Sequence, residues 1–149
     1  MKHSYWFNSE LFQVQKREGE ETNPRCYGKE LGTWLCSKFK NLGYKDVKLI
    51  PEDWGWCVMC SSENYMLWVC CGAILNEDYD ETYDPDSPPK AKDITWHVFP
   101  EIEVPIFFFN SWVKNLIGKL DLEQPLNKLN NELSQILNPE PKIVLCDEP

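Results

Sequence analysis

The sequence predicts a single domain of the α+β class, with a mainly antiparallel sheet of five to six strands and helices packed on it. Short apolar segments that alternate with polar residues follow one another between residues 45 and 99, which is typical of neighbouring antiparallel strands. Longer apolar patterns with helical spacing come before and after these strands. A length of 149 residues with 42% hydrophobic content fits one packed domain.

The first elements are predicted to be a strand and then a long helix. Residues 10–15 form the expected strand. Asn23 can cap a helix whose first position is Pro24, because proline has no amide hydrogen to lose there. Gly43 supplies a left-handed stop. Between these signals one apolar stripe runs through Tyr27, Leu31, Trp34, Leu35, Phe39 and Leu42.

Four strands are predicted to follow the helix. Residues 45–50 form a short strand, and residues 56–61 and 65–72 form a hairpin. Residues 93–99 form the fourth strand of this group, and the two prolines that follow it, Pro100 and Pro105, restrict further pairing to a sheet edge. The intervening residues 77–92 are expected to form a long surface loop.

The last part of the chain is predicted to form two helices and a final strand. A short helix begins near residue 110, and a second one carries a leucine stripe from Leu122 to Leu137 and stops before Pro139. Residues 142–146 can add a last strand. No internal repeat and no second domain is visible.

The charge balance limits the classes of partner. Fifteen basic against twenty-four acidic residues give a net charge of −9. We therefore expect no direct nucleic-acid binding, which needs cations that displace phosphate counterions, and no binding to an anionic membrane. Residues 1–10 lack the apolar stretch of a signal peptide, and no run approaches a membrane span. We expect a cytoplasmic protein.

The seven cysteines are predicted to be reduced residues of the core. Cys57 and Cys60 have the spacing of half a zinc site, but in a strand they point to opposite faces. The adjacent Cys70 and Cys71 do not supply the second half. We expect no metal and no cofactor.

Residues 77–86, called here the acidic segment, are the most distinctive part of the sequence. They contain six carboxylates and two tyrosines in ten positions. Repulsion between the charges keeps the segment out of the core, and a negative surface with aromatic rings suits a basic partner. A calcium loop is a poorer interpretation, because the glycine and the bidentate glutamate of the standard site are absent. A loop that only keeps the protein soluble remains an alternative.

No catalytic motif supports an enzyme. Asp53 and Trp54 lie in a predicted turn, from which Trp56 enters the core. His97 is expected to be a partly buried, hydrogen-bonded strand residue, and the chain has only one other histidine for a catalytic triad.

Several short blocks between residues 20 and 72 resemble a family of small uncharacterised bacterial proteins. This resemblance implies a bacterial cytoplasmic protein, and it attaches no activity and no catalytic residue to the chain. The acidic segment and the C-terminal helices lie outside it. The blocks are Glu21-Thr22-Asn23-Pro24, Tyr27-Gly28, Trp34-Leu35, Leu42-Gly43-Tyr44, Pro51-Glu52-Asp53-Trp54-Gly55-Trp56 and Leu67-Trp68-Val69. In general character, without a shared motif, the chain is also similar to immunity proteins and phage-encoded inhibitors.

The leading hypothesis is a binding protein that neutralises a basic protein partner, as an immunity protein does to a nuclease-type toxin domain. One alternative is a small-molecule binder or enzyme whose pocket is lined by Trp54, Trp56, Trp68 and Trp96. Another is a homodimer that pairs through the stripe from Leu122 to Leu137. The expected partner-binding residues are Asp53, Trp54, Glu77, Asp78, Tyr79, Asp80, Glu81, Tyr83, Asp84 and Asp86.

Overall fold

The structure, a computed structural model, describes residues 3–77, 79, 82–106, 109–116 and 118–149. Its strands and helices confirm the predicted α+β class. The strands are β1 (Tyr5–Asn8), β2 (Lys48–Glu52), β3 (Gly55–Ser61), β4 (Met66–Leu75), β5 (Ile94–Glu103) and β6 (Val144–Cys146). The helices are α1 (Lys29–Asn41), α2 (Phe109–Leu116) and α3 (Glu123–Leu137), with short 3-10 helices η1 (Glu18–Glu20) and η2 (Ala91–Asp93).

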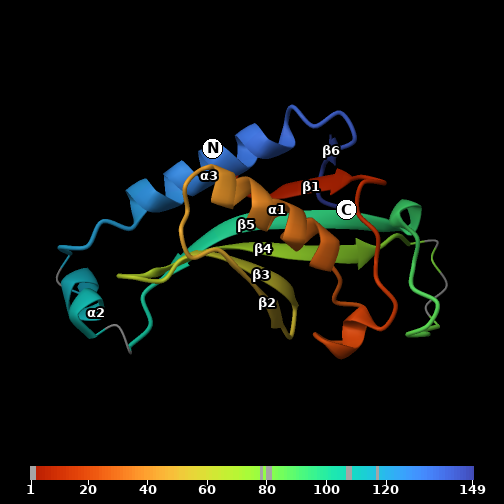
Figure 1. The fold of residues 1–149 in the computed structure, drawn as a ribbon, viewed down its shortest axis with the longest axis horizontal. Coiled ribbons are helices and arrows are strands. Elements are labelled where there is room, and N and C mark those ends of the chain that lie inside the picture. Colours follow the sequence, from red (N-terminus) through yellow and green to blue (C-terminus); the bar gives the residue numbers. More distant parts are fainter. Residues whose placement is uncertain (1–2, 78, 80–81, 107–108, 117) are drawn as a thin grey trace.

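The six strands form one sheet in the order β2-β3-β4-β5-β1-β6. Every neighbouring pair is antiparallel. The longest ladder joins β4 to β5 and runs from Met66 opposite Glu103 to Leu75 opposite Ile94 (Figure 1). The pairing of β3 with β4 confirms the predicted hairpin, which lies between β2 and β5 in the sheet.

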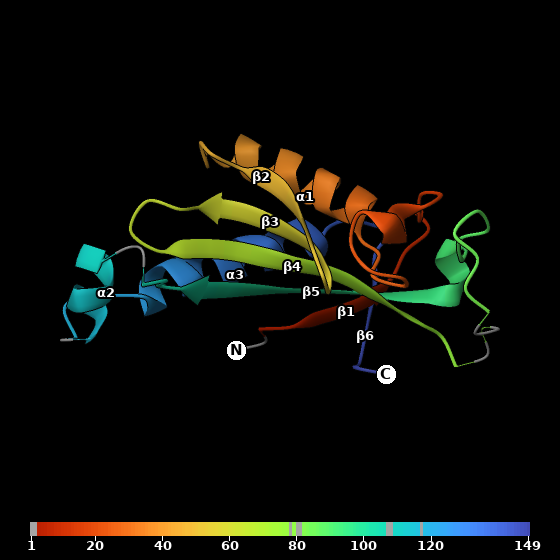
Figure 2. The same ribbon diagram turned by 90° about the horizontal axis from the view of Figure 1, so that it is seen from below.

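Helices α1 and α3 cover one face of the sheet, which we call the inner face (Figures 1 and 2). No described helix packs on the opposite, outer face, and α2 lies beyond one end of the strands in both views. The core between the helices and the inner face includes Leu31, Leu35 and Phe39 of α1, Leu129, Leu133 and Leu137 of α3, and Val58, Val69, Cys71, Trp96 and Val98 of the strands.

Helix α1 begins at Lys29, so the predicted start at Pro24 is wrong. Arg25 has a φ of 70°, a left-handed conformation that a right-handed helix cannot contain. The buried carboxylate of Glu18 accepts hydrogen bonds from the amides of Gly28 and Lys29. A glutamate from an earlier loop therefore satisfies the first free amides of the helix, in place of a local cap.

Residues 10–15 do not form a strand, which corrects a second prediction. The amide of Gln13 donates to the carboxylate of Glu30 at 2.7 Å, and the amide of Gln15 donates to that of Glu18 at 3.0 Å. These backbone donors are satisfied by side chains instead of a neighbouring strand. The first strand is β1, which precedes this segment and pairs with β5 and β6.

The remaining boundaries follow the predicted signals. Gly43, with a φ of 98°, ends the turn after α1. Strand β5 pairs with β1 only through residues 96–98, so from Pro100 onward it has β4 alone as a neighbour, as expected of a proline. Helix α3 stops before Pro139, and Leu129, Leu133 and Leu137 of its leucine stripe are buried in the core, whereas Leu122 and Leu126 are partly exposed. Among the described residues, no helix has the length and apolar character that crossing a membrane requires.

Candidate functional site

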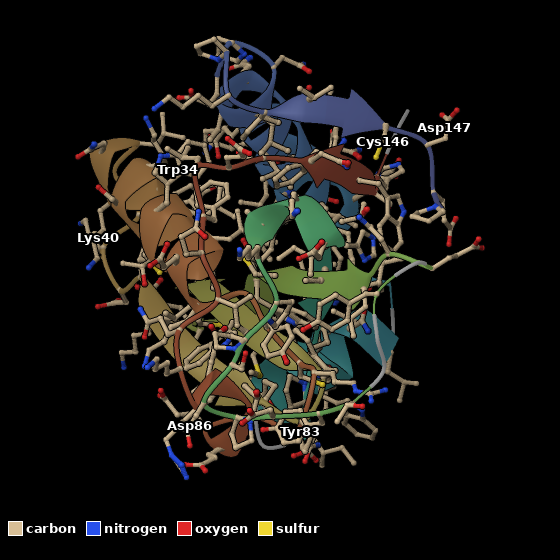
Figure 3. The ribbon with its side chains drawn as sticks, turned by 90° about the vertical axis from the view of Figure 1, so that its right-hand side faces the viewer. Trp34, Lys40, Tyr83, Asp86, Cys146 and Asp147 are labelled. Carbon is tan, nitrogen blue, oxygen red and sulfur yellow. The ribbon has the colours of Figure 1, made fainter. Side chains whose placement is uncertain are left out.

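The acidic segment lies at the surface, and its second half is tethered to the loop that contains η1 (Figure 3). The amide of Arg17 donates to the carbonyl of Pro85 at 2.8 Å, and the Arg17 guanidinium lies 3.5 Å from the carboxylate of Asp86. Asp84 and Asp86 remain exposed. The predicted surface position is confirmed for the described residues, but this half does not project freely. The predicted site residues Asp78, Asp80 and Glu81 lie outside the described residues.

The two tyrosines of the acidic segment lie beside a buried third one, Tyr27. Burial, together with smaller contributions from the neighbouring Tyr83 and Tyr79, raises the pKa of Tyr27 to about 12. Tyr83 also lines a closed crevice with Gly19. It is 36% exposed, and Tyr79 is half-buried. Each tyrosine therefore contacts the domain while leaving part of its surface open to a partner.

Residues 23–25 connect the acidic segment to the predicted turn at Asp53 and Trp54. The side-chain amide of Asn23 donates to the carbonyl of Asp53 at 2.9 Å. On the other side of the loop, Arg25 and Tyr79 line one shallow hollow beside β4. The structure therefore brings together two groups of predicted site residues that are more than twenty positions apart in the sequence.

The outer face of the sheet carries a continuous row of aromatic side chains. Its members come from β1, β4, β5 and the turn between β2 and β3. The register places Trp6 opposite His97, and their positions are on the side of the sheet away from Trp96 and Val98. We call this row the aromatic face: Trp6, Trp54, Trp68, His97 and Phe99.

Each ring of the aromatic face contacts the next. Trp6 stacks on His97 with 3.7 Å between ring centroids and nearly parallel planes. His97 lies 5.0 Å from Phe99, and Phe99 lies 6.4 Å from Trp68. Trp54 stacks over Trp68 at 5.4 Å. The distances from Trp68 to Trp54 and to Phe99 are those of favourable aromatic pairs, which contribute about 0.5–1.5 kcal/mol each beyond burial.

The rings of the aromatic face differ in their exposure to solvent. Trp54 is 42% exposed, whereas the other four members are partly buried. The indole N–H of Trp68 is buried and has no hydrogen-bond acceptor among the described residues. Contacts between rings, rather than hydrogen bonds, therefore hold Trp68 and Trp54 in place.

Three small or flexible side chains lie beneath the aromatic face. Cys57, Met59 and Cys70 point outward from the sheet, yet they are only 4–6% exposed. The register places Met59 opposite Trp68 and Cys70 opposite Phe99, so aromatic rings are their cross-strand neighbours. Burial raises the pKa of the Cys57 and Cys70 thiols to about 12 each, so both are protonated at neutral pH. Cys60 belongs to the inner core, which confirms that Cys57 and Cys60 point to opposite faces.

Carboxylates surround the aromatic face. Glu101 lies directly opposite Trp68 in the ladder between β4 and β5, and Glu103 follows it on the same face. Glu52, at the end of β2, lies near enough to Cys57 to raise its pKa, as does Glu103. All three glutamates are exposed. The surroundings of the rings are thus predominantly negative.

His97 contacts a serine hydroxyl and two aromatic rings. Its Nε2 lies 2.6 Å from the Ser4 hydroxyl, and its ring is sandwiched between Trp6 and Phe99. Burial lowers the pKa of His97, while Glu148 opposes that shift. The histidine is partly buried and hydrogen-bonded, as predicted.

The buried carboxylate of Glu18 is structural rather than reactive. Besides the two amides at the start of α1 and the amide of Gln15, it accepts the indole N–H of Trp56 at 3.0 Å. Glu18 is 1% exposed. Four donors therefore share its two oxygens. In the sequence it is one of several charged residues between 16 and 23, and nothing distinguishes it there.

The predicted tryptophan-lined pocket is not formed. Trp56 and Trp96 are 2% and 0% exposed within the core, whereas Trp54 and Trp68 stack on the outer face. The four side chains therefore lie on opposite sides of the sheet. Among the described residues, no three histidine, cysteine or acidic side chains are grouped closely enough to hold a metal ion.

Part of the aromatic face could be predicted from the sequence. The alternation in residues 93–99 places His97 and Phe99 on one side of a strand, and the strand of Trp68 is equally clear. That these strands are neighbours, and that Trp54 folds over them, depends on register and tertiary packing.

Comparison of the chain with protein-family models, curated proteins and solved structures gives no match.

Proposed function

We propose that the protein binds a basic protein partner and neutralises it by covering its active surface. The most specific form of this proposal is an immunity protein that inhibits a nuclease-type toxin in the cytoplasm of a bacterium. A nuclease needs a basic cleft for its phosphate substrate, so an inhibitor rich in carboxylates can compete for that cleft.

One observation carries the proposal. The acidic segment and the turn at Trp54, selected separately from the sequence, lie on either side of the loop of residues 23–25. Exposed carboxylates and partly exposed aromatic rings therefore occupy neighbouring surface, and this combination suits a protein interface with a basic partner.

The net charge of −9 adds a long-range contribution. Attraction between opposite charges accelerates the encounter of two proteins, whereas desolvated aromatic anchors slow their separation. We assign the first role to the carboxylates of the acidic segment and the second to Tyr79, Tyr83 and Trp54. A cytoplasmic location suits seven cysteines, of which five are buried thiols.

Affinity purification from the native host tests the proposal. The tagged chain should retain a protein with an isoelectric point above about 9. The matched control carries Asp78→Asn, Asp80→Asn, Glu81→Gln and Asp84→Asn, which remove four charges with little change of volume. This variant should retain less of the partner.

The purified partner then decides whether binding is inhibitory. Its activity should disappear at about one equivalent of the chain, and an unrelated acidic protein should have no such effect. A retained partner that is acidic, or one whose activity persists in excess chain, would refute the proposed function.

A further inference from the structure

Apart from Trp54, the outer face of the sheet is not used by the proposed function. Helices α1 and α3 cover the inner face, whereas the rings of the aromatic face are at least partly exposed. Neighbouring strands are about 4.8 Å apart, so a row that crosses from the turn of Trp54 to Trp6 on β1 offers a long strip of stacking surface. A surface strip of partly exposed aromatic rings is typical of an interaction site.

The surroundings of the strip select the chemistry of its occupant. Glu101 is the cross-strand partner of Trp68, and side chains so placed have Cβ atoms about 5 Å apart. Glu52 and Glu103 approach the same region from β2 and β5. Lys48 is the cross-strand partner of Met59 and is the one cation at the described outward positions of β2 to β5. An anionic occupant would be repelled, whereas a cationic one is attracted.

The cation that best fits rings bordered by carboxylates is a guanidinium. Its flat face stacks on an indole, and its edge donates two parallel hydrogen bonds to one carboxylate. The chain satisfies other aromatic rings with its own cations: Lys29 lies over Trp56, Lys38 over Trp34, and Lys128 over Tyr44. No described lysine or arginine lies over a ring of the aromatic face.

We propose that the aromatic face binds arginine side chains of the partner, with Trp54 and Trp68 as the stacking surface and Glu52, Glu101 and Glu103 as acceptors. The inference deepens the proposed function and rests on it only for the partner being a basic protein. It adds a second contact surface, continuous with the first through Trp54.

Short peptides test this binding without the partner. Isothermal titration of the full chain with hexa-arginine and with hexa-lysine, at the same salt concentration, compares stacking with charge alone. Hexa-arginine should bind at least about fivefold more tightly, because lysine offers no planar group. In Trp54→Ala and in Glu101→Gln this preference should fall severalfold. Both residues are exposed, so the variants should remain folded.

A matched control removes charge elsewhere. Asp84→Asn combined with Asp86→Asn should weaken both peptides equally and leave the arginine preference unchanged. Equal affinity for the two peptides, or a preference that survives Trp54→Ala, would overturn the proposal. Tighter binding of a hexathymidine oligonucleotide would overturn it as well. A dimer in sedimentation that Trp54→Ala dissociates would assign the face to a second copy, and would also overturn it.

The two proposals can fail separately. If no basic partner is captured but hexa-arginine binds as described, only the proposed function fails. If a basic partner is captured and inhibited, and Trp54→Ala and Glu101→Gln leave its affinity unchanged, the aromatic face, Trp54 included, has no role and the proposed function stands on the acidic segment alone.

Discussion

Replacing Glu18 by alanine should cost more stability than any other single charge removal in the chain. The side chain is 1% exposed and accepts hydrogen bonds from the amides of Gln15, Gly28 and Lys29 and from the indole of Trp56. A buried donor left without an acceptor costs about 1–3 kcal/mol. Two of the four donors, the Gly28 amide and the Trp56 indole, are fully buried, and they alone give a loss of about 2–6 kcal/mol, a large part of the 5–15 kcal/mol that holds a typical domain together.

Two further variants make the measurement specific. In Glu18→Gln the amide oxygen can keep the position of Oε1, but the NH₂ group then faces the amide of Gln15, so we expect about half the loss. Glu20→Ala removes an exposed glutamate two residues away, 3.3 Å from Arg17, and should change stability by less than about 0.5 kcal/mol.

Urea unfolding followed by tryptophan fluorescence gives all three free energies of unfolding, and the melting temperature of Glu18→Ala should fall by roughly 10 °C. A loss below about 1 kcal/mol would mean that the carboxylate does not hold these donors.

Three other predictions concern the backbone, the thiols and one histidine. Gly28→Ala should destabilise the fold by about 2 kcal/mol, because φ at this position is 146° and the new Cβ would lie 2.7 Å from the Cys71 carbonyl oxygen. As a control in the same unfolding assay, Gly72→Ala should be tolerated, because its new Cβ meets nothing within 4 Å. Iodoacetamide at pH 8 should modify at most the two partly exposed cysteines of the native chain, Cys26 and Cys146, and intact mass spectrometry counts the modified residues. Labelling of a buried cysteine would contradict the raised pKa values. Because burial lowers the pKa of His97 in the folded state, its contribution to stability is complete above about pH 6.5 and should decline as the pH falls below that value. A His97→Gln variant should lose this part of the pH dependence of unfolding.

Local patterns were sufficient for the elements whose signals lie within them. The hairpin of β3 and β4, the stop at Gly43 and the end of α3 before Pro139 all depend on residues close in sequence. The same is true of the two faces of β5, where Trp96 enters the core and His97 does not.

Predictions failed where a distant side chain replaced a local partner. Glu18 satisfies amides ten and eleven residues away and thereby sets the start of α1, which no capping rule within the helix can anticipate. Glu30, seventeen residues from Gln13, takes a backbone donor that a strand would have used. The pocket of four tryptophans failed for another reason, because Trp54 and Trp56 are separated by one glycine with a φ of 147° and enter opposite sides of the sheet.

The sequence predicted the acidic segment of the candidate site, but not the aromatic face beside it. The acidic segment is recognisable from charge alone, and its neighbourhood with Asp53 follows from the hydrogen bond that Asn23 donates. The aromatic face requires the register of β1, β4 and β5, which brings Trp6, Trp68 and Phe99 together across the sheet.

The salt dependence of association tests the central claim, that carboxylates of this chain attract a basic partner, most directly. Stopped-flow mixing of the chain with the purified partner gives the association rate constant at increasing sodium chloride. We expect it to fall by about tenfold or more between about 50 mM and about 500 mM salt, because steering by exposed charges is screened over this range. The variant with Asp78→Asn, Asp80→Asn, Glu81→Gln and Asp84→Asn should start several-fold slower and lose much of that dependence. An association rate that is the same at both salt concentrations, for the native chain and for the variant alike, would contradict the claim.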